Sequence, residues 1–205
     1  MGEHLYTYDD PPNERHLDQI VGWLERDGVV ALPTGTNWAF AASATSKKAE
    51  KRLRRLKPEH PKDRPFALLC SDIAMAASMT YVDGAAYRRL RRLWPGPYTV
   101  LLKANHELPR VLRTKRAVVG VRIPEEALVR TIVERLGGPL MVSTIPDGPS
   151  GPYRMGYEVQ EALSHGVDLV VDLGTELPGT ETTVLSMLDG LVEVVREGAG
   201  PIDAL

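Results

Sequence analysis

The sequence predicts an α/β fold: a twisted mixed β-sheet with flanking helices, in a single domain that spans residues 1–205. Three observations carry this prediction. Short apolar runs alternate along the chain with segments whose apolar residues recur at helical spacing. A length of 205 residues, with 43% hydrophobic and 25% charged residues, suits one domain with one continuous core. The last two apolar runs are joined through Asp189-Gly190, a dipeptide typical of hairpin turns, so the sheet is expected to be mixed.

The first elements follow from periodicity and from turn residues. In residues 14–27 the apolar side chains recur at helical spacing, which predicts an amphipathic helix with Gly28 as its C-cap. Residues 29–32 predict a short buried strand. A second amphipathic helix is expected to start from an N-cap within residues 43–46 and to end before Pro58.

The later elements continue the alternation of strand and helix signals. Strands are expected at residues 66–70, 98–103, 117–123, 140–143, 168–173, 183–187 and 191–196. Helices are expected near residues 84–93, 125–136 and 156–164. The last two strands are expected to form the hairpin.

The turn after the first strand, residues 33–40, is a candidate ligand site. Its sequence is Pro-Thr-Gly-Thr-Asn-Trp-Ala-Phe. Such a turn leaves backbone N–H groups and two hydroxyls free at the carboxyl end of the sheet, where open α/β sheets bind ligands. The Gly-Lys-Ser/Thr ending of a Walker loop is missing. Taken alone, the segment is equally compatible with an ordinary threonine-based turn.

Positive charge is concentrated in the middle of the chain. Residues 47–122 hold 19 of the 25 Lys and Arg but only 6 of the 27 Asp and Glu, although the whole chain carries a net charge of −2. Residues 47–57, 88–92 and 110–116 supply most of it. Such a field attracts phosphates, either of a nucleotide or of RNA. The alternative is that these side chains are solvated helix faces balanced by acidic neighbours elsewhere in the fold.

Other features argue against several protein classes. No apolar run reaches the roughly 18 residues of a membrane span, and residues 1–13 are polar and acidic rather than a secretion signal. The single cysteine, Cys70, ends an apolar run, so a buried thiol is expected rather than a nucleophile. The five histidines show no metal-ligand spacing. We therefore expect a cytoplasmic protein without membrane association and without a structural metal.

Five further motifs stand where strands begin or end. They are Trp94-Pro95-Gly96-Pro97-Tyr98-Thr99, Val119-Gly120-Val121-Arg122-Ile123-Pro124, Pro139-Leu140-Met141-Val142-Ser143-Thr144, Thr182-Thr183-Val184 and Val194-Val195-Arg196-Glu197-Gly198. Together with the turn, their order and spacing over residues 20–200 resemble the YrdC/YciO family, which includes the threonylcarbamoyl-AMP synthases of tRNA modification. Residues 81–83, 107–110 and 196–200 are more similar to the YciO branch.

The resemblance implies a YrdC-like fold with a positively charged concave cavity. It also implies the synthesis of L-threonylcarbamoyladenylate from L-threonine, bicarbonate and ATP with release of pyrophosphate, where Mg²⁺ accompanies the ATP. This chemistry needs positioned cations and hydroxyls rather than a nucleophilic side chain. The implied substrate-binding residues are Thr34, Thr36, Arg122, Ser143, Thr144 and Thr182, and the implied nucleotide-binding residues are Lys57, Arg64 and Arg196.

Some of these residues also have a structural interpretation. Arg122 and Arg196 stand in apolar strands, where each could form an ion pair at a sheet edge. Lys57 follows a helix, where a lysine favours the helix dipole.

The sequence departs from the family pattern at three places. Where the family commonly has Pro-Thr-Asp/Glu-Thr and then Tyr-Gly, this chain has Gly35 for the acid and Trp38-Ala39 for the pair. The family's Lys-x-Arg appears as Lys57-Pro58-Glu59, and its Ser-Ala-Asn as Ile145-Pro146-Asp147. We therefore expect weak or altered synthase activity. The alternative is a protein that binds double-stranded RNA or tRNA through the basic clusters and has no synthase activity.

Overall fold

The computed structural model describes residues 2–204. Within this range, ten strands form one sheet in the order β1-β8-β2-β3-β7-β4-β6-β5-β9-β10. The sheet contains parallel pairs, such as β2 with β8, and antiparallel pairs, such as β2 with β3. The predicted mixed α/β fold is therefore confirmed.

The bounds of the elements are as follows. The strands are β1 (Glu3–Tyr6), β2 (Val30–Pro33), β3 (Trp38–Ser43), β4 (Ala67–Leu69), β5 (Tyr98–Lys103), β6 (Val118–Arg122), β7 (Leu140–Thr144), β8 (Leu169–Asp172), β9 (Thr183–Ser186) and β10 (Glu193–Arg196). The α-helices are α1 (Glu14–Glu25), α2 (Lys47–Leu56), α3 (Ile73–Met79), α4 (Gly84–Leu93), α5 (Ala127–Leu136) and α6 (Gly156–Leu163). Two 3₁₀ turns, Arg110–Leu112 and Ile202–Ala204, complete the described chain.

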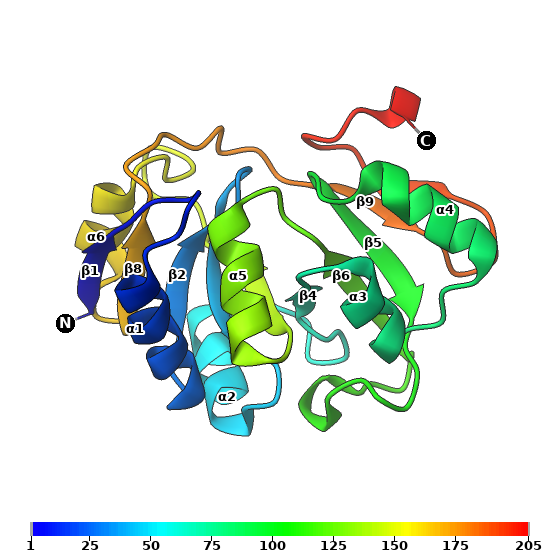
Figure 1. Ribbon diagram of the computed structural model, residues 1–205, viewed down its shortest axis with the longest axis horizontal. Helices are drawn as coiled ribbons and strands as arrows, with labels where there is room; N and C mark the ends of the chain where they lie inside the picture. The colour runs from blue at the N-terminus through cyan, green and yellow to red at the C-terminus, as the bar shows by residue number, and fades with distance from the viewer. Residues whose placement is uncertain (1, 205) are drawn as a thin grey trace.

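Two clusters of buried side chains connect the helices to the sheet. In Figure 1, α1 and α5 lie side by side over β2, while α4 lies beside β5 and β9. The first cluster joins α1 and α5 to β2, β3 and β8, and the second includes residues of α2, α3 and α4. In β5, Val100 belongs to the second cluster, whereas the neighbouring Thr99 lines a cavity. The alternation along β5 thus directs Thr99 into the cavity and its neighbour Val100 into the core.

Helix α1 begins as predicted but ends differently. The side chain of Asn13 accepts hydrogen bonds from the N–H groups of Arg15 and His16, as an N-cap does. The predicted C-cap at Gly28 is wrong, because the helix ends earlier and Asp27 adopts the left-handed conformation, with φ of 61°. Aspartate tolerates this region better than most residues. Its carboxylate is held by the Ser46 hydroxyl at 2.5 Å.

The β2–β3 hairpin corrects the prediction for residues 33–40. Only Thr34 to Asn37 form the turn, because Trp38 is already paired with Pro33 in the antiparallel ladder. The strand signal was hidden because β3 is buried almost throughout and rich in alanine, so it shows no polar and apolar alternation. The hairpin places the hydroxyls of Thr34 and Thr36 on a short, rigid connection.

Two further elements lie outside the sequence-based expectations. Strand β1 pairs in parallel with β8, and α3 starts at the N-cap Asp72. The predicted hairpin of β9 and β10 is confirmed as an antiparallel pair, although six residues, 187–192, connect the strands. Gly190, with φ of 79°, lies within that connection.

The predictions for Cys70 and for membrane-spanning helices can be compared with the fold. Cys70 is completely buried, and burial raises the pKa of its thiol to about 12, so its expected burial is confirmed. Among residues 2–204, no helix combines the length and the apolar character needed to cross a bilayer.

Candidate functional site

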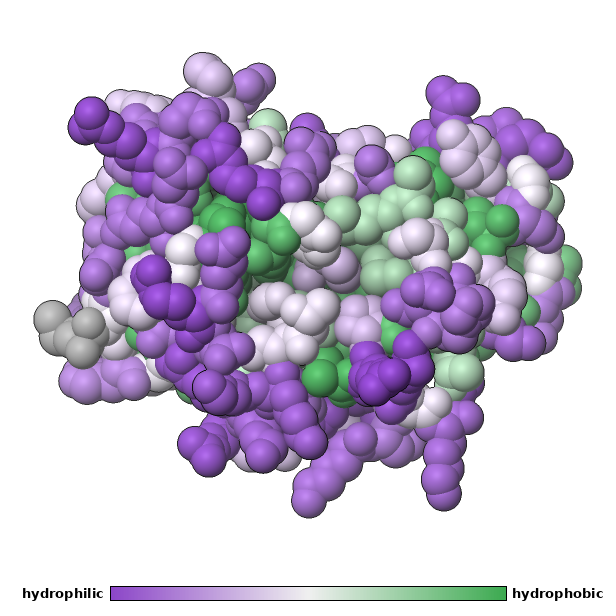
Figure 2. All heavy atoms as spheres, turned by 60° about the horizontal axis from the view of Figure 1, so that its bottom comes forward, coloured by the Kyte–Doolittle hydropathy of each residue, from purple (hydrophilic) through white to green (hydrophobic). Residues whose placement is uncertain are grey.

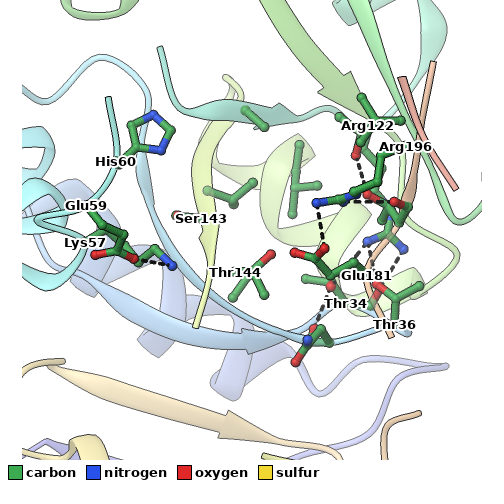
Figure 3. Close-up of a pocket in the computed structure, with 18 of the residues that line it drawn as sticks. Thr34, Thr36, Lys57, Glu59, His60, Arg122, Ser143, Thr144, Glu181 and Arg196 are labelled. Carbon is green, nitrogen blue, oxygen red and sulfur yellow. Dashed lines mark hydrogen bonds and ion pairs between the residues drawn. The ribbon is translucent and has the colours of Figure 1, made fainter. Parts of the chain in front are cut away.

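A cavity of about 400 Å³ lies where the β2–β3 turn and the loop after α2 meet the ends of β6 and β7 and residues of β5 and β9. Figure 3 shows the side chains that line it. Eight of the nine residues predicted to bind substrate or nucleotide lie together there: Thr34, Thr36, Lys57, Arg122, Ser143, Thr144, Thr182 and Arg196. They come from segments as far apart in sequence as the first hairpin and the last strand. Their assembly in one cavity makes it the candidate site, and their individual roles stay predictions.

Arg64 is the predicted residue that the structure does not bring to the cavity. Its N–H bonds back to the carbonyl of Pro61, and its side chain is exposed to solvent. The loop instead turns His60 inward, where the imidazole stacks on Phe66 with ring centroids 4.4 Å apart. The expected approach of Arg64 to the cavity is therefore not observed.

Arg122 clamps the β2–β3 turn from the end of β6. Its guanidinium donates to the carbonyl oxygens of Gly96 at 3.1 Å and Thr34 at 2.7 Å. It also donates to the hydroxyls of Thr34 at 3.3 Å and Thr36 at 3.1 Å. All four acceptors are uncharged, so the structural alternative of an ion pair does not describe this residue. The fork geometry of arginine allows one side chain to fix both threonines.

The clamp leaves one hydroxyl proton available to a ligand. The Thr34 hydroxyl donates its proton to the carbonyl of Asn37 at 2.7 Å. The Thr36 hydroxyl accepts from Arg122, and its own proton has no acceptor among the residues that the structure describes. Thr36 is thus oriented by a cation and can donate to an anion, such as a carboxylate, in the cavity.

Two other cations face the cavity from opposite sides, and each is paired with a glutamate. Lys57 Nζ lies 2.8 Å from a carboxylate oxygen of Glu59. Arg196 lies 2.7 Å from Glu181 and also donates to the carbonyl of Thr182 at 2.9 Å. In Figure 3 the Lys57 pair lies at one end of the cavity and the Arg196 pair at the other, beside Arg122. A ligand that contacts both cations must therefore span the cavity.

Both glutamates are largely exposed to solvent, so a phosphate can take their place. Their side chains are 58% and 52% exposed, for Glu59 and Glu181 respectively. The hydrogen bond from Lys57 lowers the pKa of Glu59, so this carboxyl is ionised when it neutralises the lysine. Exposed ion pairs contribute about 0–1 kcal/mol, so a ligand phosphate could replace either carboxylate at low cost.

Sequence reasoning missed several lining residues. Glu181, His60 and Thr99 all face the cavity. Thr99 hydrogen-bonds the hydroxyl of Thr182 at 2.9 Å, and burial lowers the pKa of His60. Glu181 and Thr99 each adjoin or belong to a recognised motif, so proximity in sequence was an available signal. For His60 the loop conformation had to be known.

Glu126, at the N-cap of α5, is a half-buried carboxyl whose Oε2 atom is shielded from solvent. Burial raises its pKa, while Arg122 lowers it and the carboxylates of Asp9 and Glu125 raise it. A carboxyl with a raised pKa in the folded state stabilises the protein below its unfolded pKa, and this stability is lost as pH rises through the folded pKa. The free energy of unfolding of Glu126→Gln should therefore rise relative to that of wild type as pH increases above about 4.3, the ordinary pKa of a glutamate.

Urea unfolding at a series of pH values measures this difference. Glu125→Gln is the matched control, because Glu125 is the exposed neighbour of the same type. A difference between wild type and Glu126→Gln that stays constant with pH would show that the carboxyl is not perturbed.

Most of the basic residues lie away from the cavity. From the cluster at residues 47–57, only Lys57 lines it, while Arg52 forms a two-pronged ion pair with Asp168 at 2.7 and 3.0 Å. The four arginines of α4 are exposed to solvent. Figure 2 shows hydrophilic side chains projecting around the rim of one face, with paler and apolar ones in its middle. Binding of RNA by these clusters stays a prediction.

Comparisons with known proteins agree with the resemblance seen in the motifs. The sequence model of the Sua5/YciO/YrdC family, described as telomere recombination, matches residues 23–198. YciO of Escherichia coli strain K12, described as uncharacterized, is 31% identical over 204 residues, or 98% of each chain. The threonylcarbamoyl-AMP synthase of Bacillus subtilis is 28% identical over 91% of this chain and 54% of its own length.

Solved structures give the same relationship. The crystal structure of E. coli YciO matches with a TM-score of 0.91 at 30% identity and covers 100% of this chain and 99% of that one. P. abyssi Sua5 complexed with L-threonine matches with a TM-score of 0.85 at 22% identity, covering 99% of this chain and 59% of that one, which shows a shared fold. The family model matches most of the sequence, and YciO is 31% identical over nearly the full length of both chains. The chain therefore belongs to the Sua5/YciO/YrdC family.

Proposed function

We propose that this protein is an L-threonylcarbamoyladenylate synthase-like protein that binds L-threonine, bicarbonate and ATP in the cavity. One observation carries the proposal. The cavity gathers Thr34 and Thr36 under the clamp of Arg122 at one end and Lys57 at the other. The chain also shares its fold with a Sua5 protein whose structure contains L-threonine. An amino acid beside a nucleotide fits a cavity with a hydroxyl donor at one end and separated cations.

The proposed reaction needs two steps. The amine of threonine adds to bicarbonate and forms a carbamate with loss of water. A carbamate oxygen then attacks the α-phosphorus of ATP, a new P–O bond forms, and the bond to the β-phosphate breaks so that pyrophosphate leaves. The protein's part is to hold the anions close and to stabilise the charge that develops on phosphate oxygens. Mg²⁺ enters with the ATP and is held largely by phosphate oxygens.

Several lining residues have a proposed part in this arrangement. The Thr36 hydroxyl and Arg122 orient the threonine carboxylate, and Thr182 supports the same substrate from the other wall. Lys57 and Arg196 contact phosphates after Glu59 and Glu181 swing away. Ser143 and Thr144, at the end of β7 between the two ends of the cavity, contact the carbamate where the substrates join.

The departures from the family pattern set the expected level of activity. Glu59 neutralises Lys57 at the place where the family has an arginine. Ile145, where the family has a serine, is 3% exposed and packs in the core. A missing charge-assisted hydrogen bond to phosphate costs about 1.5–3 kcal/mol of binding or transition-state stabilisation. We therefore propose that the protein binds its substrates but forms the adenylate slowly.

Thermal unfolding with substrates tests the binding proposed here. L-threonine and MgATP together should raise the unfolding midpoint above the value with either alone, because each ligand binds the folded state. At 100 times its dissociation constant, one ligand adds about 2.7 kcal/mol to the free energy of unfolding. D-threonine, which cannot present its amine and hydroxyl in the same arrangement, is the control.

Incubation with labelled threonine, bicarbonate and MgATP then measures the reaction through pyrophosphate and labelled adenylate. A midpoint that moves with neither substrate, together with a blank reaction at high protein concentration, would refute the proposed function.

A further inference from the structure

The backbone of Gly35 packs directly against the carboxyl group of Glu126. A Cβ at position 35 would overlap Oε1 of Glu126 and lie 2.8 Å from its Cδ. Gly35 has φ of 72°, a conformation that favours glycine, and the turn carries no side chain between the two threonines. The family pattern has an aspartate or glutamate at this position. The space where that acidic side chain would begin is therefore filled, in this chain, by a carboxyl group from another element.

Glu126 reaches this space because it does not cap its own helix. It occupies the N-cap position of α5, yet its side chain makes no capping hydrogen bond. Asp9, from the segment after β1, accepts the hydrogen bond of the Leu128 N–H at 2.9 Å instead. A second acid thus performs the capping role, and the Glu126 side chain is free to turn towards Gly35.

Arg122 and Glu126 are oppositely charged groups on either side of the same turn. Arg122 is 5% exposed and its hydrogen-bond acceptors are all uncharged. Burial lowers the pKa of Arg122, and the negative charges of Glu126 and then of the exposed Glu125 raise it. A buried guanidinium needs a nearby opposite charge, because desolvation otherwise makes its charged form costly. Glu126 supplies that charge through the turn.

The second oxygen of Glu126 points to a functional rather than a stabilising role. Oε2 is buried and has no hydrogen-bond partner within residues 2–204. An unsatisfied buried carboxylate oxygen lowers stability, because the group loses its hydration without gaining a partner. A group that costs stability and packs against a turn of the candidate site is characteristic of a functional role.

We infer that Glu126 is a positioning residue of the candidate site. Its carboxylate holds the Thr34–Gly35–Thr36 turn and Arg122 in the geometry that binds the amino acid, and it replaces, from α5, the acidic side chain that the family pattern carries in the turn. The inference rests on the proposed function for the identity of the ligand. In this chain the carboxylate of Glu126 then takes the place of the acidic side chain that is missing at Gly35.

Moving the carboxylate back to the turn tests the exchange. Titration calorimetry with L-threonine compares wild type, Glu126→Ala, Gly35→Asp and the double variant Gly35→Asp/Glu126→Ala. Each single variant should bind about tenfold or more weakly, the first because the charge is missing and the second because the two carboxyl groups would overlap. The double variant should recover to within about threefold of wild type, since aspartate is among the non-glycine residues that best tolerate a positive φ.

Two further variants separate positioning from folding. Glu126→Gln keeps the shape of the side chain and should bind threonine as weakly as Glu126→Ala while its near-ultraviolet circular dichroism matches wild type. Glu125→Ala removes the adjacent exposed carboxyl and should bind within about twofold of wild type. A double variant that binds no better than Glu126→Ala, or a Glu126→Gln protein with wild-type affinity, would overturn the inference.

A measurement without ligand distinguishes this inference from the proposed function. If wild type shows no heat of binding with threonine, no shift of its unfolding midpoint with either substrate and no reaction, the proposed function fails. The positioning role is then tested by a double-mutant cycle with Glu126→Gln and Arg122→Met, read as urea midpoints. Non-additive shifts support coupling across the turn, whereas additive shifts would contradict it.

Discussion

Replacing Arg122 with lysine is expected to abolish measurable threonine binding, with a loss of about 100-fold or more, and to lower the free energy of unfolding by about 2–4 kcal/mol. The guanidinium donates to two carbonyls and two hydroxyls from one planar fork. Lysine carries a compact ammonium group that cannot reach all four acceptors in these directions. The carbonyls of Gly96 and Thr34 would then lose a buried donor. Calorimetric titration with threonine and urea unfolding measure the two effects.

Arg196→Lys is the matched control for this prediction. Arg196 also lines the cavity, but its side chain is 42% exposed and pairs with an exposed glutamate. Its replacement should change the free energy of unfolding by less than about 0.5 kcal/mol, because exposed ion pairs contribute little. If Arg122→Lys retained threonine affinity within a few-fold of wild type, the clamp would not be part of the binding site.

The elements that local sequence predicted well have strong start and stop signals. The bounds of α4 match the prediction, because Asp83 caps its first turn through the N–H groups of Ala85 and Ala86, and an apolar stripe fixes its inner face. Strand β5 also matches, since it follows a proline and glycine segment and alternates in burial. In both cases the information lies within about ten residues of the chain.

The elements that were missed depend on distant partners. Strand β1 is only partly buried and is held by pairing with β8, more than 160 residues away. Strand β3 is buried on both faces, and its alanine-rich sequence lacks the alternation of polar and apolar residues that would predict a strand. Helix α3 has seven residues, which is too short for helical periodicity to be recognised. Tertiary contacts, rather than local preference, determine these three elements.

In the candidate site, too, some residues could be predicted from local motifs and others depend on distant contacts. The residues that motifs carry into the cavity, such as Thr36 and Arg122, could be predicted from sequence. Glu126 could not, because its role depends on the absence of a side chain at Gly35 and on Asp9 capping α5 in its place. Such an exchange between two elements leaves no local pattern. It becomes visible only where the fold brings the elements into contact.

Glu59 determines how strongly the Lys57 end of the cavity can attract phosphate. Its carboxylate is 2.8 Å from Nζ of Lys57, whose side chain is only 16% exposed. The lysine is therefore held in place, while the glutamate, at 58% exposed, is the partner that can be changed without disturbing the core. A variant at position 59 tests the electrostatics of the cavity more cleanly than one at position 57.

Glu59→Arg is expected to raise the affinity for MgATP by about 10- to 100-fold, because it frees Lys57 and adds a donor fork for phosphate. Glu59→Gln, which only frees the lysine, should raise the affinity for MgATP by up to about fivefold, which corresponds to the contribution of about 1 kcal/mol of an exposed ion pair. Titration calorimetry at several salt concentrations measures both, and the gain should shrink as salt rises. Glu176→Arg makes the same change of charge at an exposed residue outside the cavity lining and should leave ATP affinity within about twofold. Equal affinities for Glu59→Arg and Glu176→Arg would show that the nucleotide phosphates do not lie at this end of the cavity.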